Sequence, residues 1–178
     1  MCAARWGFPL LCALLLTPVT ALAQQLLEFD ARVGPAITLG DFSDVADAGA
    51  FLSGTVLANV GAPFSIGLEL GGNLGHSKGS LDTSIFQFTP VARIEAPLAG
   101  GRGKAYLLIG AGYYRTDYEQ GSTASRSCND FGVNAGAGFL VKISPRSMAG
   151  FDLRYHHLFE SGADPEYLVP GLLLTFTP

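Results

Sequence analysis

The sequence predicts an all-β protein, folded as an eight-stranded antiparallel up-and-down transmembrane β-barrel. Three observations lead to this prediction. Apolar and polar residues alternate through eight segments after residue 25. These segments have the ~9–11 residues that a tilted strand needs to cross a bilayer. Their connections are alternately short and long, which would place short turns at one end of a barrel and long loops at the other.

The clearest alternation runs from residue 149 to residue 159. One set of alternate residues is mainly apolar or aromatic: Ala149, Phe151, Leu153, Tyr155, His157 and Phe159. The other set is small or ionisable: Gly150, Asp152, Arg154 and His156. Successive side chains of a strand point to opposite faces. A soluble sheet buries its apolar face, whereas a transmembrane barrel turns that face to lipid. The positive mean hydropathy of the chain, +0.31, favours the membrane.

The N-terminus has the pattern of a secretory signal peptide. Arg5 is followed by an apolar run at 8–16, and Ala21 and Ala23 provide small residues for cleavage. We therefore expect residues 1–23 to be removed and residues 24–178 to form one barrel domain. The net charge of −4 offers no basic patch for nucleic acid.

Eight strands are expected in the mature chain. Their approximate ranges are 26–38, 49–59, 64–74, 85–96, 105–114, 131–142, 149–159 and 167–176. Three of them contain a proline, at Pro35, Pro90 and Pro170. Because proline cannot donate a hydrogen bond to the ladder, bulges or early strand ends are expected at these positions.

The connections favour a membrane barrel. Those after the second, fourth and sixth strands are short, at 60–63, 97–104 and 144–147. Those after the first, third, fifth and seventh are mostly longer and more polar, at 39–48, 75–84, 115–130 and 160–166. Short turns at one rim and long loops at the other are typical of outer-membrane barrels. Closure of the sheet also leaves no strand edge in lipid.

Charged residues follow the same division. The long loops carry ten acids: Asp41, Asp44, Asp47, Asp82, Asp117, Glu119, Asp130, Glu160, Asp164 and Glu166. The face opposite the apolar one carries acids and bases in near balance: Glu28, Asp30, Glu69, Glu95 and Asp152 with Arg32, Arg93, Lys142 and Arg154. An unpaired buried charge is costly, and side chains nearly fill an eight-stranded barrel. We therefore expect a charge network that plugs the lumen.

Aromatic residues of the apolar face gather toward the two expected rims. The short-turn rim would have Phe29, Phe64, Phe139, Phe151 and Phe176. The long-loop rim would have Phe86, Phe88, Tyr113, Phe131, Tyr155 and Phe159. Two aromatic girdles at the membrane interfaces are a feature of transmembrane β-barrels.

With these features the chain resembles the small eight-stranded outer-membrane barrels of the outer-membrane protein A, outer-membrane protein X and opacity-like types. The C-terminal strand is similar to the family's assembly signal, with Gly171, Leu172, Leu174 and Phe176 in an alternating strand that ends in an aromatic residue. Thr177 and Pro178 extend beyond that pattern. The resemblance implies a bacterial outer-membrane location and recognition by the barrel-assembly machinery.

The resulting functional hypothesis is a non-enzymatic barrel without cofactor or metal. It would be a rigid scaffold in contact with outer-membrane lipid and lipopolysaccharide. It would present acidic loops for surface interaction or envelope integrity.

Two alternatives remain at this point. The chain also resembles the lipid A deacylase barrels, which use a His and a Ser two residues apart with an acid further on. Here His156 or His157 would act with Ser161, although the spacing departs from that pattern. The other alternative is a soluble lipocalin-like carrier, whose apolar face would turn inward.

Overall fold

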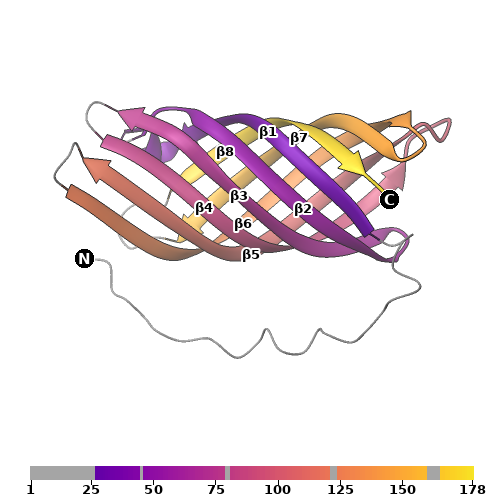
Figure 1. Cartoon of the computed structure of the whole chain (residues 1–178), viewed down its shortest axis with the longest axis horizontal. Coiled ribbons are helices and arrows are strands. Elements are labelled where there is room, and N and C mark those ends of the chain that lie inside the picture. The colour runs from indigo at the N-terminus through magenta and orange to yellow at the C-terminus, as the bar shows by residue number, and fades with distance from the viewer. Residues whose placement is uncertain (1–26, 45, 79–80, 121–123, 160–164) are drawn as a thin grey trace.

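The computed structural model describes residues 27–44, 46–78, 81–120, 124–159 and 165–178. The expected signal peptide and Ser161 lie outside these residues. The chain forms a closed barrel in which antiparallel strands follow chain order and β8 pairs with β1 (Figure 1). The strands are β1 (Leu27–Leu39), β2 (Gly49–Gly61), β3 (Phe64–Lys78), β4 (Leu81–Pro97), β5 (Gly103–Gln120), β6 (Ala124–Ser144), β7 (Ser147–Phe159) and β8 (Glu166–Phe176). The prediction of an eight-stranded antiparallel barrel is confirmed.

The two faces of the wall are inverted relative to a soluble barrel. On β8, Leu172 and Leu174 are 67% and 51% exposed, whereas Leu173 between them is buried. On β7, Phe151 and Leu153 are exposed on either side of buried Asp152. The apolar face therefore points outward and polar side chains line the lumen, which is the arrangement of a barrel in lipid. A lipocalin-like carrier needs the opposite arrangement, so that alternative is wrong.

The lumen contains two apolar layers. One lies toward the long-loop end and consists of Ala36, Phe42, Ala46, Phe51, Ile85, Tyr114, Leu158, Tyr167 and Val169. The other lies toward the short-turn end and consists of Leu57, Val91, Tyr106, Leu108, Leu140 and Leu173. Among the described residues, no helix has the length and hydropathy needed to span a membrane.

The prediction of bulges or strand ends at the prolines is wrong. β1 and β8 keep one register on both sides of Pro35 and Pro170, from Val33↔Leu172 to Ile37↔Leu168. β4 likewise keeps its register with β5 across Pro90. The missing donors interrupt the ladder locally, but the pairs on either side hold the strands in line. Register shifts occur elsewhere, between Asn59 and Gly61, Asn73 and His76, and Lys142 and Ser144.

Two of the expected long loops are largely strand, which corrects the ranges 75–84 and 115–130. β3 and β4 pair out to Lys78↔Leu81, and β5 and β6 pair out to Gln120↔Ala124. Polar residues occupy both faces of these extensions: His76, Thr83 and Thr116 are buried, whereas Ser77 and Asp82 are exposed. The sequence therefore loses its alternation there, while the backbone ladder continues.

The first connection, 39–48, differs from a surface loop. It contains the short 3-10 helix η2 (Gly40–Asp44), in which Phe42 is buried. This segment packs against β1 and β8 at the long-loop end of the barrel (Figure 1).

Candidate functional site

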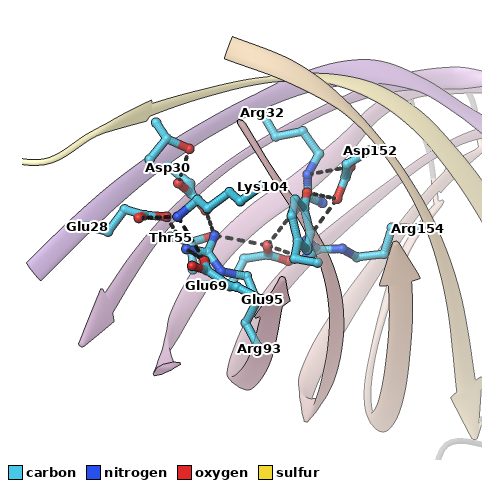
Figure 2. Close-up of polar contacts among 12 residues, drawn as sticks. Glu28, Asp30, Arg32, Thr55, Glu69, Arg93, Glu95, Lys104, Asp152 and Arg154 are labelled. Atoms are coloured by element: carbon cyan, nitrogen blue, oxygen red, sulfur yellow. Dashed lines mark hydrogen bonds and ion pairs between the residues drawn. The ribbon is translucent and has the colours of Figure 1, made fainter. Parts of the chain in front are cut away.

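A group of four charged side chains crosses the middle of the lumen (Figure 2). We call Arg32, Glu69, Asp152 and Arg154 the central cluster. Glu69 Oε2 on β3 accepts Arg32 Nη2 from β1 at 2.8 Å and Arg154 Nη1 from β7 at 2.6 Å. Asp152 pairs with Arg32 Nε at 3.0 Å and with Arg154 Nη2 at 3.1 Å. Each side chain is at most 2% exposed. Two acids and two bases thus form a neutral buried group.

Neutral side chains add hydrogen bonds to the two carboxylates. Thr55 Oγ1 donates to Glu69 Oε2 at 3.1 Å, and Gln87 Nε2 donates to Glu69 Oε1 at 2.6 Å. The Tyr106 hydroxyl donates to Asp152 Oδ2 at 3.0 Å. Hydrogen bonds of this kind offset part of the cost of burying ions, although Arg32 Nη1 and Arg154 Nε make no hydrogen bond among the described residues.

A second group lies nearer the short-turn end, where Glu28, Asp30, Arg93, Glu95 and Lys104 form what we call the basal cluster (Figure 2). Arg93 pairs with Asp30 at 2.8 Å, with Glu95 at 2.5 Å and with Glu28. Lys104 Nζ bridges Glu28 at 2.6 Å and Glu95 at 2.9 Å. Three acids and two bases give this cluster a formal charge of −1. The side chains of Glu28, Glu95 and Lys104 are 15–20% exposed, so solvent reaches this end.

The two clusters bring together eight of the nine charged residues expected in the lumen. The ninth, Lys142, is exposed and lies outside both clusters. Lys104 was expected in a turn, but β5 begins at Gly103. Tyr106 and Leu108 face the lumen, and Lys104 is two residues before Tyr106. Extending the same alternation would have placed Lys104 on the inner face.

The two adjacent histidines on β7 lie on opposite faces. His156 is buried in the lumen, where its ring stacks on Tyr167 at 4.5 Å and its Nδ1 lies 3.2 Å from the Tyr114 hydroxyl. It therefore has no contact with membrane lipid. His157 lies on the outer face, with Nδ1 3.0 Å from Glu166 Oε1 and its ring 4.7 Å from the ring of Phe159.

The residues expected in the aromatic girdles point outward. Ten of the eleven are at least 41% exposed: Phe29, Phe64, Phe86, Phe88, Tyr113, Phe131, Phe139, Phe151, Phe159 and Phe176. Tyr155 is partly exposed. Leu172, Leu174 and Phe176 of the expected assembly signal share this outer face, whereas Gly171 faces the Arg32 side chain in the lumen.

The outer rim is acidic in the described residues. Asp41, Asp44, Asp47, Asp82 and Glu119 are exposed, and Asp117 pairs with Arg115 at 3.0 Å. In the part of the chain that the structure describes, no group of three or more His, Cys, Asp or Glu side chains is arranged to hold a metal ion.

The barrel is closed, its apolar face points outward and its lumen is charged. These three features agree with one protein family. Residues 10–171 match the model of the outer membrane protein β-barrel domain. The chain belongs to this family. Its members are small outer-membrane β-barrels, and this protein is located in the bacterial outer membrane.

Solved structures share the fold of this outer-membrane barrel. Neisserial surface protein A has 10% identity and a TM-score of 0.73, over 85% of this chain and 97% of that one. The N-terminal β-barrel domain of Pseudomonas aeruginosa OprF has 14% identity and a TM-score of 0.60, over 86% and 97%. Yersinia pestis Ail, in complex with the heparin analogue sucrose octasulfate, has 13% identity and a TM-score of 0.51, over 85% and 99%. No curated protein matches the sequence at a significant level.

Proposed function

We propose that this protein is a non-enzymatic outer-membrane scaffold with a plugged lumen, which presents an acidic outer rim for surface interaction or envelope integrity. The observation that carries the proposal is the central cluster, because its buried ion pairs connect β1, β3 and β7 across the lumen. Such pairs fix the relative positions of strands far apart in the sequence. A wall braced in this way is suited to holding its outer rim in place.

A plugged lumen is supported by the order of side chains along the barrel axis. The apolar layer that contains Phe42, Phe51, Tyr114 and Tyr167, which we call the aromatic layer, lies toward the long-loop end, and the central cluster follows. The second apolar layer and the basal cluster lie toward the short-turn end. The interior of an eight-stranded barrel is just wide enough for side chains to fill. These layers leave the barrel suited to support rather than to conduction.

The exposed acids indicate which partners suit the rim. Asp41, Asp44, Asp47 and Asp82 would repel lipopolysaccharide phosphates directly, so contact with them would need a divalent cation as a bridge. They would likewise repel a sulfated sugar such as the one bound to Ail. We propose that a surface partner of this protein is cationic or is bridged by Mg²⁺ or Ca²⁺. Removal of residues 1–23 on export and recognition of the last strand by the barrel-assembly machinery belong to the same proposal.

The hydrolase alternative has one favourable observation, the pair of His157 with Glu166 on the outer face. A carboxylate that orients an imidazole is part of the arrangement that activates a hydroxyl nucleophile. The residue two positions after His157 is Phe159, whose ring contacts the imidazole. Phe159 has no hydroxyl, so we propose that the protein leaves lipid A intact. Mass spectrometry of lipid A from expressing cells tests this, and loss of an acyl chain that depends on His157 would revive the alternative.

Planar-bilayer recording tests the plugged scaffold. We expect the purified protein to show no stable open level. The Glu69→Ala/Arg154→Ala variant should conduct, because it removes one acid and one base from the central cluster together. Asp117→Ala/Arg115→Ala, which removes an exposed pair, is the matched control and should stay silent. A stable open level in the wild-type protein would contradict the proposal.

A further inference from the structure

The outer mouth of the lumen is covered by the chain itself. We call residues 40–44 and 46–48 the lid. Phe42 and Ala46 of the lid are 1% and 0% exposed and belong to the aromatic layer of the lumen. The Ala46 amide donates to the Phe42 carbonyl at 3.0 Å, and Thr38 Oγ1 of β1 donates to the Ala46 carbonyl at 2.9 Å. The lid is therefore an internal cover rather than a solvated loop.

A side chain of another strand also holds the lid. His76 of β3 is fully buried, and its Nδ1 lies 2.6 Å from the carbonyl oxygen of Asp47. Its ring centroid is 5.9 Å from that of Phe42. A Cβ atom on Gly49 would lie 3.0 Å from the imidazole, so the ring is closely confined. Since the Asp47 carbonyl can only accept, Nδ1 carries the proton in this contact.

His76 reaches the lid because β3 is irregular there. Asn73 points into the lumen, Leu74 is exposed, and the register with β4 shifts between Asn73 and His76. Gly75 has a φ of 77°, a left-handed conformation that glycine adopts at such bulges. The shift turns His76 inward just beyond Leu74, the last exposed apolar residue of β3. His76 thus lies outside the membrane-spanning part of the strand.

The other nitrogen of His76 has no partner among the described residues. Nε2 is buried and makes no hydrogen bond there. At this end of the barrel, the charged residues on the elements around the ring are Asp41, Asp44 and Asp47 of the lid, Lys78 of β3, Asp82 of β4 and Glu166 of β8. Glu69 of β3 and Arg93 and Glu95 of β4 belong to the central and basal clusters. The four aspartates are exposed, Asp82 accepts a bond from Ser77, and Glu166 pairs with His157. β2 contains no charged residue. None of these carboxylates forms an ion pair with His76.

We propose that the lid is an acid-released cover of the lumen and that protonation of His76 releases it. A second proton would place a positive charge and an N–H group at buried Nε2, where no described acceptor lies. Such a charge is costly unless the group moves to water. Separation of the ring from Phe42 and the Asp47 carbonyl would give the imidazolium access to water. Release would uncover Phe51 and the rest of the aromatic layer.

The electrostatics of the site agree with this direction. Burial lowers the pKa of His76 below its ordinary value, and the hydrogen bond to the Asp47 carbonyl opposes this in part. The closed state therefore favours neutral imidazole. It is stable at neutral pH and loses stability as the pH falls below the ordinary histidine pKa of about 6.5. The inference adds a movable part to the proposed scaffold and does not depend on the conductance of the lumen.

A fluorescent reporter on the lid tests the proposal. The only tryptophan of the sequence is Trp6, so Phe42→Trp in a Trp6→Phe background gives one indole at the lid. The protein is purified from outer membranes, and quenching of the indole by iodide is measured from about pH 7.5 to about pH 5, above the ordinary pKa of carboxyl groups. We expect quenching to rise severalfold at acid pH while the gel mobility of the folded barrel is unchanged.

Two histidine variants separate release of the lid from general loosening. His76→Asn keeps a donor near the position of Nδ1 but does not titrate, so its indole should stay protected at acid pH. His157→Gln removes the outer-face histidine and should behave like the parent. Acid-dependent quenching that persists in His76→Asn would overturn the proposal, as would constant quenching in the parent.

A second measurement needs no substitution at Phe42. Hydrogen exchange of the peptide that contains the Ala46 amide, corrected for the intrinsic effect of pH, should become faster at acid pH in the wild-type protein but not in His76→Asn. Equal protection at both pH values in the wild-type protein would also overturn the proposal.

Discussion

Arg154 on β7 and Glu69 on β3 are 85 residues apart in the sequence, and their side chains meet across the lumen at 2.6 Å. Arg32 of β1 contacts the same carboxylate oxygen. Glu69 is thus the shared partner of two guanidinium groups from two other parts of the wall. Removing its charge would leave the central cluster with an excess of positive charge in a place that water does not reach.

Glu69→Gln should therefore destabilise the barrel strongly. Breaking a buried ion pair by removing one partner costs about 3–5 kcal/mol, because the remaining charge is uncompensated. The free energy of unfolding in lipid vesicles, followed in urea by the loss of the compact gel band, measures the change. Gln retains most of the volume and one acceptor, so a loss of this size reports charge rather than a cavity.

The exposed pair of Arg115 and Asp117 is the control for this prediction. Its side chains are 54% and 27% exposed, and ion pairs at such sites contribute about 0–1 kcal/mol. Asp117→Asn should leave the free energy of unfolding nearly unchanged. If Glu69→Gln were as mild as Asp117→Asn, the central cluster would not brace the wall.

The sequence predicted those parts of the fold that depend on alternation. Where one face meets lipid and the other meets the lumen, as at Phe151, Asp152 and Leu153, the period of two is unmistakable and gives both the strand and its orientation. The same parity placed Glu69, Arg93 and Arg154 inside. It could not show which acid meets which base, because partners such as Glu69 and Arg154 come from distant strands and depend on barrel closure.

Apart from the undisturbed registers at Pro35, Pro90 and Pro170, the main features that the sequence did not predict lie beyond the membrane. The projecting ends of β5 and β6 have polar residues on both faces, so the ladder continues without any alternation to reveal it. The bulge at Gly75 reverses the parity of β3, and strict alternation from Asn73 would have turned His76 outward. Phe42 is buried in the outer mouth of the lumen because of tertiary packing. The only indication of this in the local sequence is that Phe42 is an apolar residue among the acidic residues of the loop.

The outward apolar face leads to a prediction that depends on depth. Leu153 lies at the middle of β7 and is 42% exposed, whereas Ile143 is 61% exposed beside the turn after β6. Arginine on the lipid face costs about 2–4 kcal/mol at the midplane and about 0–1 kcal/mol near an interface. Leu153→Arg should therefore lower the free energy of unfolding in vesicles much more than Ile143→Arg. Similar losses at both positions would contradict the predicted placement in the bilayer.

Close strand contact at Gly150 gives a prediction with a matched glycine as control. A Cβ atom on Gly150 of β7 would overlap the carbonyl oxygen of Phe139 on β6, whereas one on Gly54 of β2 would meet only the Asp30 carbonyl oxygen at 3.9 Å. Gly150→Ala should impair pairing of β6 with β7 and reduce the yield of folded, heat-modifiable protein. Gly54→Ala should fold like the wild-type protein. Equal folding yields would mean that β6 and β7 do not approach as closely as the structure has them.

Lys104→Met should destabilise the barrel less than Glu69→Gln, and by an amount that depends on salt. Lys104 is the ammonium between Glu28 and Glu95, and its loss changes the formal charge of the basal cluster from −1 to −2. These side chains are 15–20% exposed, so water and counterions reduce the repulsion.

For Lys104→Met we expect the free energy of unfolding to fall by about 1–3 kcal/mol at low salt, between the values for exposed and buried pairs. Unfolding free energies at low and high salt measure it, and the loss should shrink at high salt. For Glu69→Gln the loss of unfolding free energy should be nearly independent of salt, because ions do not reach the central cluster. If the two variants showed a similar salt dependence, the two clusters would be equally hydrated.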